Sequence, residues 1–459
     1  MTRQNLLFIL LVSVAAGLVL FLPVPPETGA KVLPALALTV FTVGLWATGG
    51  LPEYYTSLIF FVLALVFAIA PADVVFSGFR SSAFWLIAGG VVIGMAANRT
   101  GLGRFLAHAF VSRLNKSYPQ LISGIVFGAV ILAFLIPAAI ARIIILMPIA
   151  FGLADQLGFE KGSKGRTGMV LAVTFGSFFV PLTILPANLP NVVLAGVADG
   201  LYDIKITYGL YLLMNFPITG ALKGIILVAL ICFFFGEKIP HPGSKGDAAP
   251  RLSTEGLRLA IIVGLTLTVW ATDFIHGIAP GWVAIVTAII CLAPGLGVIG
   301  PSDFRKDTSF QTLFFVAAVL AVGNVAATSG AGALIADALL TLTHFAPGNT
   351  VYAYGVFSGI SIVICLFATL PGTIAVLAPF AGEVAEASGL PLVTVLMMLV
   401  NGFSTVFFPY QSAPLLIGIR MGGVSIADGM RLTLPLALIA VAVLLPMNFL
   451  WWQWLGFLN

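Results

Sequence analysis

Charged residues are scarce in this sequence. Asp, Glu, Lys and Arg together make up 8% of the 459 residues, whereas they make up about a quarter of a typical soluble domain. Hydrophobic residues make up 60%, and the mean hydropathy is +1.12. The composition therefore excludes a soluble enzyme or binding domain and predicts an integral membrane protein. Its long apolar runs favour α-helices over the alternating ten-residue segments of a β-barrel.

Acidic residues inside the membrane, metal-binding clusters and nucleotide-binding loops are also missing. No Asp or Glu falls in the middle of a predicted span, so proton coupling through a buried carboxylate is not expected. The cysteines lie in apolar runs without disulfide or zinc spacing, and the histidines lie in loops or interfacial segments (Cys232, Cys291, Cys365; His108, His241, His276, His344). We therefore predict no enzyme activity, no cofactor and no nucleic-acid partner.

Apolar runs divide the chain into two similar halves. Residues 1–235 contain predicted scaffold helices within about 5–98, an interfacial helix at 100–115, a hairpin and a broken helix within 120–198, and a helix at 207–235. The polar residues 236–254 indicate a cytoplasmic linker. Residues 255–459 repeat this order, with scaffold helices within about 256–327, an interfacial helix at 330–344, a hairpin and a broken helix within 351–424, and a helix at 430–455. These segments predict an all-α polytopic membrane protein with about 11 transmembrane helices.

Short motifs recur about 230 residues apart, which indicates a duplication. The segment from Phe84 to Gly103 resembles the segment from Leu313 to Gly332, and Leu146-Met-Pro resembles Leu377-Ala-Pro. Basic residues gather on one side of the membrane if each interrupted hairpin enters and leaves on the same face. The positive-inside rule then places the amino terminus in the cytoplasm and opens the two hairpins to opposite faces. We therefore predict an inverted repeat with two re-entrant hairpins and two broken helices.

Four breaks interrupt the apolar runs, at Pro137-Ala-Ala139, Pro186–Asn191, Pro371-Gly-Thr373 and Pro409–Pro414. Irregular backbone at membrane depth is tolerated only inside protein or beside water, and inverted-repeat transporters place their binding sites at such breaks. Helix amino termini favour an anion there, while freed carbonyls at helix carboxyl termini could coordinate a cation. The pattern predicts a secondary transporter, and the alternative is that these prolines only kink packed helices.

At these breaks the sequence resembles the divalent anion/sodium symporters, a family of the ion transporter superfamily. Leu185-Pro-Ala-Asn-Leu-Pro-Asn-Val-Val193 is similar to that family's Gly-Thr-Pro-Pro-Asn loop, and Phe408-Pro-Tyr-Gln-Ser-Ala-Pro-Leu-Leu-Ile-Gly418 is similar to its second copy. The resemblance covers about residue 40 to the end of the chain. It implies a homodimer with a scaffold domain and a mobile transport domain, an elevator-type mechanism, and dicarboxylates, citrate or sulfate as substrates.

The hairpin tips depart from the Ser-Asn-Thr signature of that family. The corresponding positions carry almost no polar side chains; they are Ala138, Ala139 and Ile140 in the first tip and Thr369, Leu370 and Pro371 in the second. The resemblance then implies a substrate site made by Arg142, Ala138, Ala139, Asn188, Asn191, Thr369, Thr373, Gln411 and Ser412. It implies weaker ion-binding positions at Ile140, Ala187, Pro371, Gly372 and Ala413, with sodium as the coupling ion to test.

Arg142 is a charge in an apolar run, a few residues past the first tip. A charge in hydrocarbon needs a partner or a function. One hypothesis is that its guanidinium replaces the charge of sodium and clamps a carboxylate or sulfonate. The alternative is that it hydrogen-bonds hairpin carbonyls and only braces the tip. Lys223 is a second buried cation candidate, and we expect its long side chain to reach toward the membrane interface.

The leading interpretation is a secondary transporter of small anions such as di- or tricarboxylates, sulfate or sulfonates. It places the chain in the inner (plasma) membrane as a multi-pass protein, with the lipid bilayer, a small anion and a second copy as partners. Sodium-independent exchange, with Arg142 as a fixed cation, is the first mode considered. The alternatives are sodium-coupled symport with backbone sodium sites, or an anion channel or sensor on the same scaffold.

Overall fold

Apolar runs form helices throughout the part of the chain that the structure describes. The computed structural model describes residues 3–23, 29–111, 117–240, 251–300, 304, 310–332, 334, 341 and 343–458. Every regular element within these residues is helical, and nine helices among them are long and apolar enough to cross a membrane. The predicted all-α, multi-pass membrane architecture is therefore confirmed.

The first helices of each half form one body. In the first half they are α1 (Arg3–Val19), α2 (Val32–Thr48), α3 (Glu53–Val66), α4 (Ala72–Val75), η1 (Ser77–Arg80), α5 (Ser82–Arg99) and α6 (Leu102–Val111). In the second half they are α13 (Thr254–Ala271), α14 (Asp273–His276), α15 (Pro280–Leu292) and α17 (Phe310–Ser329). Helix α17 contacts α2 and α3, and α15 lies along α5, so the two halves are interleaved rather than side by side.

Small residues allow α5 and α15 to pack at very short range. A Cβ atom on Gly281 would stand 1.8 Å from the carbonyl oxygen of Ser82, and one on Gly89 would stand 2.6 Å from the backbone of Ala284. Close backbone approach of this kind is how helices associate where the hydrophobic effect is weak. The α5–α15 pair therefore forms a closely packed wall among the first helices of the two halves.

Each half then contains a helical hairpin and a broken helix. The first hairpin is α7 (Tyr118–Leu135) and α8 (Ala139–Gln156), and the first broken helix is α9 (Lys164–Gly176), η2 (Val180–Thr183), η3 (Leu185–Ala187) and α10 (Leu189–Tyr202). The second hairpin is α19 (Thr350–Phe367), α20 (Leu370–Leu377), η5 (Ala378–Phe380) and α21 (Ala381–Ser388). The second broken helix is α22 (Leu392–Phe403), η6 (Pro409–Gln411) and α23 (Ala413–Met421).

One predicted break is misplaced. The second hairpin is interrupted at Ala368 and Thr369, so Pro371 and Gly372 lie in the first turn of α20 and not between the two legs. The reason is physical: a proline in the first turn of a helix loses no hydrogen bond, because its N–H would have had no partner there. The Thr369 hydroxyl accepts a hydrogen bond from the Gly372 N–H and thereby caps α20.

Each half ends in a long helix with a π-helical segment. The first is α11 (Tyr208–Asn215), η4 (Phe216–Leu222) and α12 (Lys223–Phe235); the second is α24 (Ile426–Ile439), η7 (Ala440–Leu444) and α25 (Leu445–Trp454). Pro217 cannot donate to the carbonyl of Leu213, and the indole of Trp451 donates to that oxygen instead, at 2.9 Å. The two long helices are therefore joined at the π segment.

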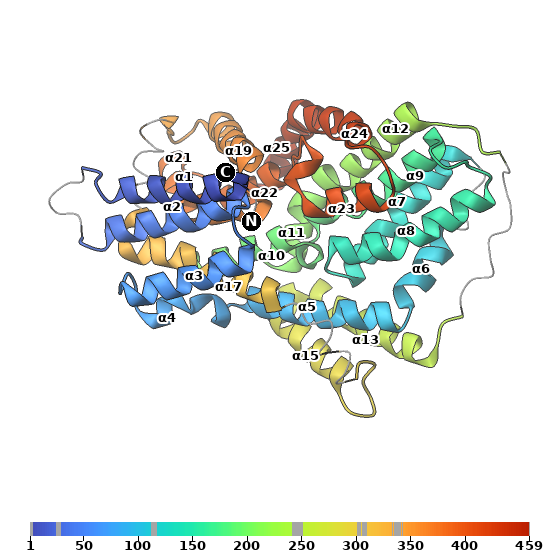
Figure 1. The fold of residues 1–459 in the computed structure, drawn as a ribbon, viewed down its shortest axis with the longest axis horizontal. Helices are drawn as coiled ribbons and strands as arrows, with labels where there is room; N and C mark the ends of the chain where they lie inside the picture. Colours follow the sequence, from blue (N-terminus) through green and yellow to red (C-terminus); the bar gives the residue numbers. More distant parts are fainter. Residues whose placement is uncertain are drawn as a thin grey trace.

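The hairpins and broken helices of the two halves interlock. Helix α23 packs on α8 and α9, while α20 packs on α10, so the second part of each broken helix touches the hairpin of the other half. Figure 1 shows α7, α8, α9 and α23 together on one side of the molecule, with α1, α2, α3 and α17 on the other. The four breaks thus belong to one packed unit.

Some predictions fall partly outside the described residues. Residues 241–250 of the predicted linker and most of the predicted interfacial segment 330–344 are among them. The first interfacial prediction corresponds to α6 (Leu102–Val111). The domain boundaries, the insertion of the hairpins from opposite faces and the count of about 11 spans stay predictions.

Candidate functional site

Arg142 holds the first hairpin tip to the first broken helix. It lies in the first turns of α8, and its side chain is 0% exposed. One terminal nitrogen donates to the carbonyls of Ile136 (2.5 Å) and Ala187 (2.9 Å). The other donates to the carbonyl of Ser177 (2.7 Å) and to Oδ1 of Asn188 (3.2 Å). All four terminal N–H groups are therefore used within the protein in this conformation.

This geometry corresponds to the bracing alternative for Arg142. Each terminal nitrogen of a guanidinium carries two hydrogens, and none is left to clamp an anion in a fork. The remaining Nε–H has no hydrogen-bond partner among the described residues. The positive charge itself is retained beside the first tip, with no carboxylate paired to it among the described residues.

The side chains of Asn188 and Asn191 also hydrogen-bond to the backbone at the break of the first broken helix. The Asn188 amide donates to the carbonyl of Phe178 at 3.4 Å, in addition to accepting from Arg142. The Asn191 amide donates to the carbonyls of Pro181 and Ile184, at 3.1 and 2.7 Å. Both asparagines therefore hold the irregular backbone between α9 and α10, which needs such partners inside a membrane protein.

Gln411 braces the break of the second broken helix, as Arg142 braces the break of the first. Its Oε1 accepts hydrogen bonds from the N–H groups of Phe407 and Phe408, at 2.9 and 2.8 Å. Its amide nitrogen donates at 2.8 Å to the carbonyl of Cys365, near the end of the first leg of the second hairpin. A single side chain thus again connects a hairpin, here the second, to the break of a broken helix by hydrogen bonds.

Lys223 is buried and does not reach the membrane interface, so the expectation drawn from its long side chain is wrong. Its side chain is 1% exposed, and Nζ donates at 2.8 Å to the carbonyl of Ser404, the residue that ends α22. The ammonium also lies 5.9 Å from the ring centre of Phe179 in the first break. The π segment η4 directly precedes Lys223, and π segments often occur at functional positions.

The other predicted residues lie at the tips and helix starts. Ala138 is exposed and immediately precedes α8, where Ala139 and Ile140 form the first turn. Ala187 precedes α10, and its carbonyl is held by Arg142. Thr373 donates at 3.3 Å to the Thr369 carbonyl in the first turn of α20. Ser412, which is 4% exposed, and Ala413 begin α23.

Four helix amino termini thus follow the four breaks. Helices α8, α10, α20 and α23 each start directly after irregular backbone, and the last three carry a proline in the first turn. First-turn N–H groups have no intrahelical acceptor and carry partial positive charge. Because most polar side chains here serve the backbone, these N–H groups and the Ser412 hydroxyl are the main polar groups that an anion could use.

Sequence reasoning missed the carbonyls of Ser177 and Ser404, which accept hydrogen bonds from the buried cations Arg142 and Lys223. A carbonyl leaves no mark in a sequence, but the positions could have been found from the duplication. Each serine directly follows the first part of a broken helix and lies between five and ten residues before the break that its prolines predict. Lys223 could be picked out from the sequence. The direction of its side chain depends on the preceding π segment, which has no clear sequence signal.

Comparisons with known proteins agree on the kind of protein. The family model for the sodium:sulfate symporter transmembrane region matches residues 3–458. A dicarboxylate transporter of Arabidopsis thaliana chloroplasts is 24% identical over 97% of this chain and 84% of its own length. An L-tartrate/succinate antiporter of Shigella sonnei is 26% identical over 82% of this chain and 79% of its own. The solved structure of the Alcanivorax borkumensis YdaH transporter aligns with a TM-score of 0.54 at 19% identity, covering 99% of both chains.

Proposed function

The chain belongs to the sodium:sulfate symporter family, and from this premise we propose that it exchanges small dianions across a membrane without a coupling sodium ion. One observation carries the proposal. Two fully buried cations, Arg142 and Lys223, lie at the breaks of the two broken helices. Neither has a carboxylate partner among the described residues. The unit that contains the breaks therefore holds two buried basic side chains that an anionic substrate can complement.

The size of the charge imbalance supports a dianionic substrate. An unpaired charge inside a membrane protein costs several kcal/mol, even when backbone carbonyls solvate it. A dianion near the four helix amino termini compensates both charges, whereas a monoanion leaves one unpaired. A further sodium ion would add a third positive charge beside carbonyls that Arg142 already occupies.

Arg142 acts in this proposal as a fixed counter-charge behind the binding surface. Its terminal nitrogens keep the first tip and the first break together, so that the N–H groups of α8 and α10 stay aligned for the anion. Gln411 aligns α23 with the second tip in the same way. Direct contacts with the anion then come from these N–H groups and from Ser412, with Thr369 and Thr373 at the second tip.

Charge compensation also favours exchange over one-way transport. If the unit that moves contains two fixed charges, it crosses the membrane readily only while a dianion is bound. Net movement of the empty unit is then slow, and dianions exchange one for one. The relatives named above as dicarboxylate and tartrate/succinate transporters make four-carbon dicarboxylates the first substrates to test. The proposed setting is an elevator-type homodimer in the inner membrane, with a cytoplasmic amino terminus.

Two alternatives make different predictions. In a sodium-coupled symporter, backbone carbonyls hold sodium and uptake depends on a sodium gradient. In a channel or sensor, an anion binds at the same breaks without alternating access. Both would be compatible with the family, but neither explains why two buried cations lie at the two breaks.

The test is counterflow in proteoliposomes. Vesicles loaded with unlabelled succinate should accumulate labelled succinate to the same extent with sodium or choline outside, whereas empty vesicles should not. Butyrate of the same chain length should not replace succinate inside. Strict sodium dependence would support symport and overturn the fixed-cation proposal, and purely conductive flux would support a channel. Tartrate, citrate and sulfate in the same assay define the substrate range.

A further inference from the structure

Asp273 joins the start of α11 to the scaffold body. It lies at the start of α14, and its side chain is 2% exposed. Its Oδ2 accepts a hydrogen bond from the backbone N–H of Tyr208, the first residue of α11. A carboxylate at a helix amino terminus is favourable because it faces free N–H groups and the positive end of the helix dipole. Asp273 therefore caps a helix that lies 65 residues away in the sequence.

A ring contact strengthens the same junction. The ring of Tyr208 stacks on Trp270 at the end of α13, with ring centres 6.1 Å apart and planes 21° apart. The Trp270 indole donates at 3.1 Å to the carbonyl of Pro280, where α15 begins. The start of α11 is thus fixed to the scaffold body through one charged contact and one aromatic contact.

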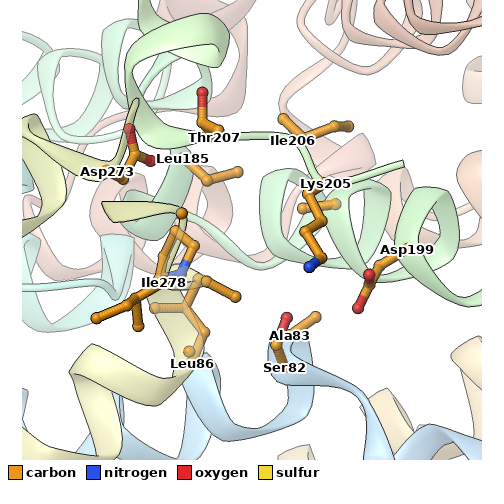
Figure 2. A pocket seen from close by; sticks show the side chains of 15 residues that line it. Ser82, Ala83, Leu86, Leu185, Asp199, Lys205, Ile206, Thr207, Asp273 and Ile278 are labelled. Carbon is orange, nitrogen blue, oxygen red and sulfur yellow. The ribbon is translucent and has the colours of Figure 1, made fainter. Parts of the chain in front are cut away.

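A cavity borders the junction between Asp273 and Tyr208. A cavity of about 40 Å³ lies between the α10–α11 corner and the wall made by α5, α14 and α15. Figure 2 shows Asp273 and Thr207 on one side of it, with Lys205 and Asp199 on the other and Leu86 and Ile278 below. The corner and the wall are in contact beside the cavity, where a Cβ atom on Gly196 of α10 would stand 2.5 Å from the Ala83 side chain, so the cavity is a small gap at the junction.

The junction connects the long helix α11–α12 to the helices next to the α5–α15 wall. Helix α12, which continues α11, packs on α7, α9 and α24, in the unit that contains the breaks. The wall α5–α15 is held together by the short contacts of Gly89 and Gly281. If these parts move relative to each other during transport, the Asp273–Tyr208 contact must open.

We propose that Asp273 is a releasable anchor that holds the start of α11 against the scaffold body in this conformation and lets go once per transport cycle. The proposal rests on the alternating access assumed in the proposed function. Two observations support it: the contact is charged, and it joins the start of α11 to α14 beside a small cavity that leaves the corner incompletely packed.

The chemistry of the contact suits release. Oδ1 of Asp273 has no hydrogen-bond partner among the described residues, so the carboxylate is only partly satisfied while it is buried. Opening exposes it to water, which supplies the missing partners and offsets the lost contact with Tyr208. The other charged groups that line the cavity, Asp199 and Lys205, lie on the α10–α11 side and move with the corner.

The decisive experiment locks the junction. A Cβ atom on Gly209 would stand 3.8 Å from Oδ1 of Asp273, so side chains at these two positions face each other across the junction. We would combine Gly209→Cys and Asp273→Cys in a chain whose Cys232, Cys291 and Cys365 are replaced by serine. Oxidation should lower succinate counterflow at least tenfold, and a reductant should restore it. Equal counterflow in the oxidised and reduced states, with cross-linking verified by mass spectrometry, would overturn the anchor.

Matched single variants keep the result interpretable. Each single cysteine variant in the same background should show no change upon oxidation, so that an effect of the pair is due to the bond. Asp273→Asn keeps an acceptor for the Tyr208 N–H but removes the charge, and it should change the counterflow rate at least threefold. Asp199→Asn, in the same cavity lining but outside the junction, should change it less than twofold. Equal effects of the two substitutions would argue against an anchor at Asp273.

Failure of the anchor can be distinguished from failure of the proposed function. If the unmodified protein exchanges dianions and the cross-linked pair does so equally well, only the anchor is wrong. If the unmodified protein shows no dianion counterflow, the proposed function is wrong. In that case, labelling of Gly209→Cys, which keeps Asp273, by an impermeant maleimide still tests the junction, because an anchor that never opens leaves this position protected.

Discussion

Ser177 and Ser404 occupy the same place in the two halves of the molecule. Each follows the last residue of the first part of a broken helix, α9 or α22, and each backbone carbonyl accepts a hydrogen bond from a buried cation. The donor is Arg142 from the same half in one case and Lys223 from the other half in the second. The carboxyl ends of these two helices, which carry partial negative charge, are thus each covered by a positive side chain.

Lys223→Met tests whether the second cation sets the charge of the substrate. Met has a similar length without charge. Its introduction removes the cost of burying an ammonium but leaves the Ser404 carbonyl without its donor, so we expect little net change in Tm. Succinate counterflow should fall at least tenfold, because a dianion would then face only one fixed charge. The exposed Lys161→Met is the control and should behave like the unmodified protein. Unaltered succinate exchange by Lys223→Met would contradict the two-cation proposal.

Arg142→Gln is expected to damage both stability and transport. Glutamine has one amide to offer to four acceptors, so the carbonyls of Ile136, Ala187 and Ser177 lose partners in a buried site. Each buried carbonyl left without a donor costs about 1–3 kcal/mol, so a thermal unfolding scan should show a large fall in Tm. The exposed Arg420→Gln should leave Tm unchanged. If Arg142→Gln kept its Tm, the bracing geometry would have to be rejected.

The sequence was sufficient to predict the architecture, because helices in a membrane need long apolar runs and breaks need proline or polar residues. The first hairpin is interrupted where Pro137 predicted, whereas α9 ends at Gly176 and α22 at Phe403, both before the breaks predicted from Pro186 and Pro409. The break at Thr369 was placed too late in the chain, because Pro371 marks the start of a helix as well as an interruption. Local sequence does not distinguish these two roles of proline.

The site was predicted less well than the fold. The position of Arg142 in an apolar run identified it as important. The two roles considered for it, an anion clamp and a brace of the hairpin tip, differ in which oxygens lie within about 3 Å of the guanidinium. That depends on tertiary packing. For Lys223 two alternatives were open, a buried cation and a structural side chain that reaches the interface, and the second was favoured because lysine side chains are long enough to reach it. The structure shows the opposite, since the lysine follows a π segment and contacts the other half of the chain.

Gln411→Glu tests the brace of the second break. The carboxylate can still accept from the N–H groups of Phe407 and Phe408, but it cannot donate to the carbonyl of Cys365. It also places a negative charge next to the helix starts that we assign to the anion. Succinate affinity, measured as the concentration that gives half-maximal counterflow, should weaken at least tenfold. The exposed Gln453→Glu is the control, and equal affinities of the two variants would argue against an anion site at this break.

Gly281→Val tests the close contact between α5 and α15. Even a Cβ atom at this position would stand 1.8 Å from the Ser82 carbonyl oxygen, so the helices must separate to admit any side chain. Overpacking typically costs about 1–3 kcal/mol, and backbone that cannot move aside places this substitution at the upper end. Gly264→Val on α13 is the control, because nothing lies within 4 Å of a Cβ there. We expect a clear fall in Tm for the first variant only. Equal Tm values would mean that the α5–α15 wall is not rigid, and the junction at Asp273 would then lack a fixed surface to hold.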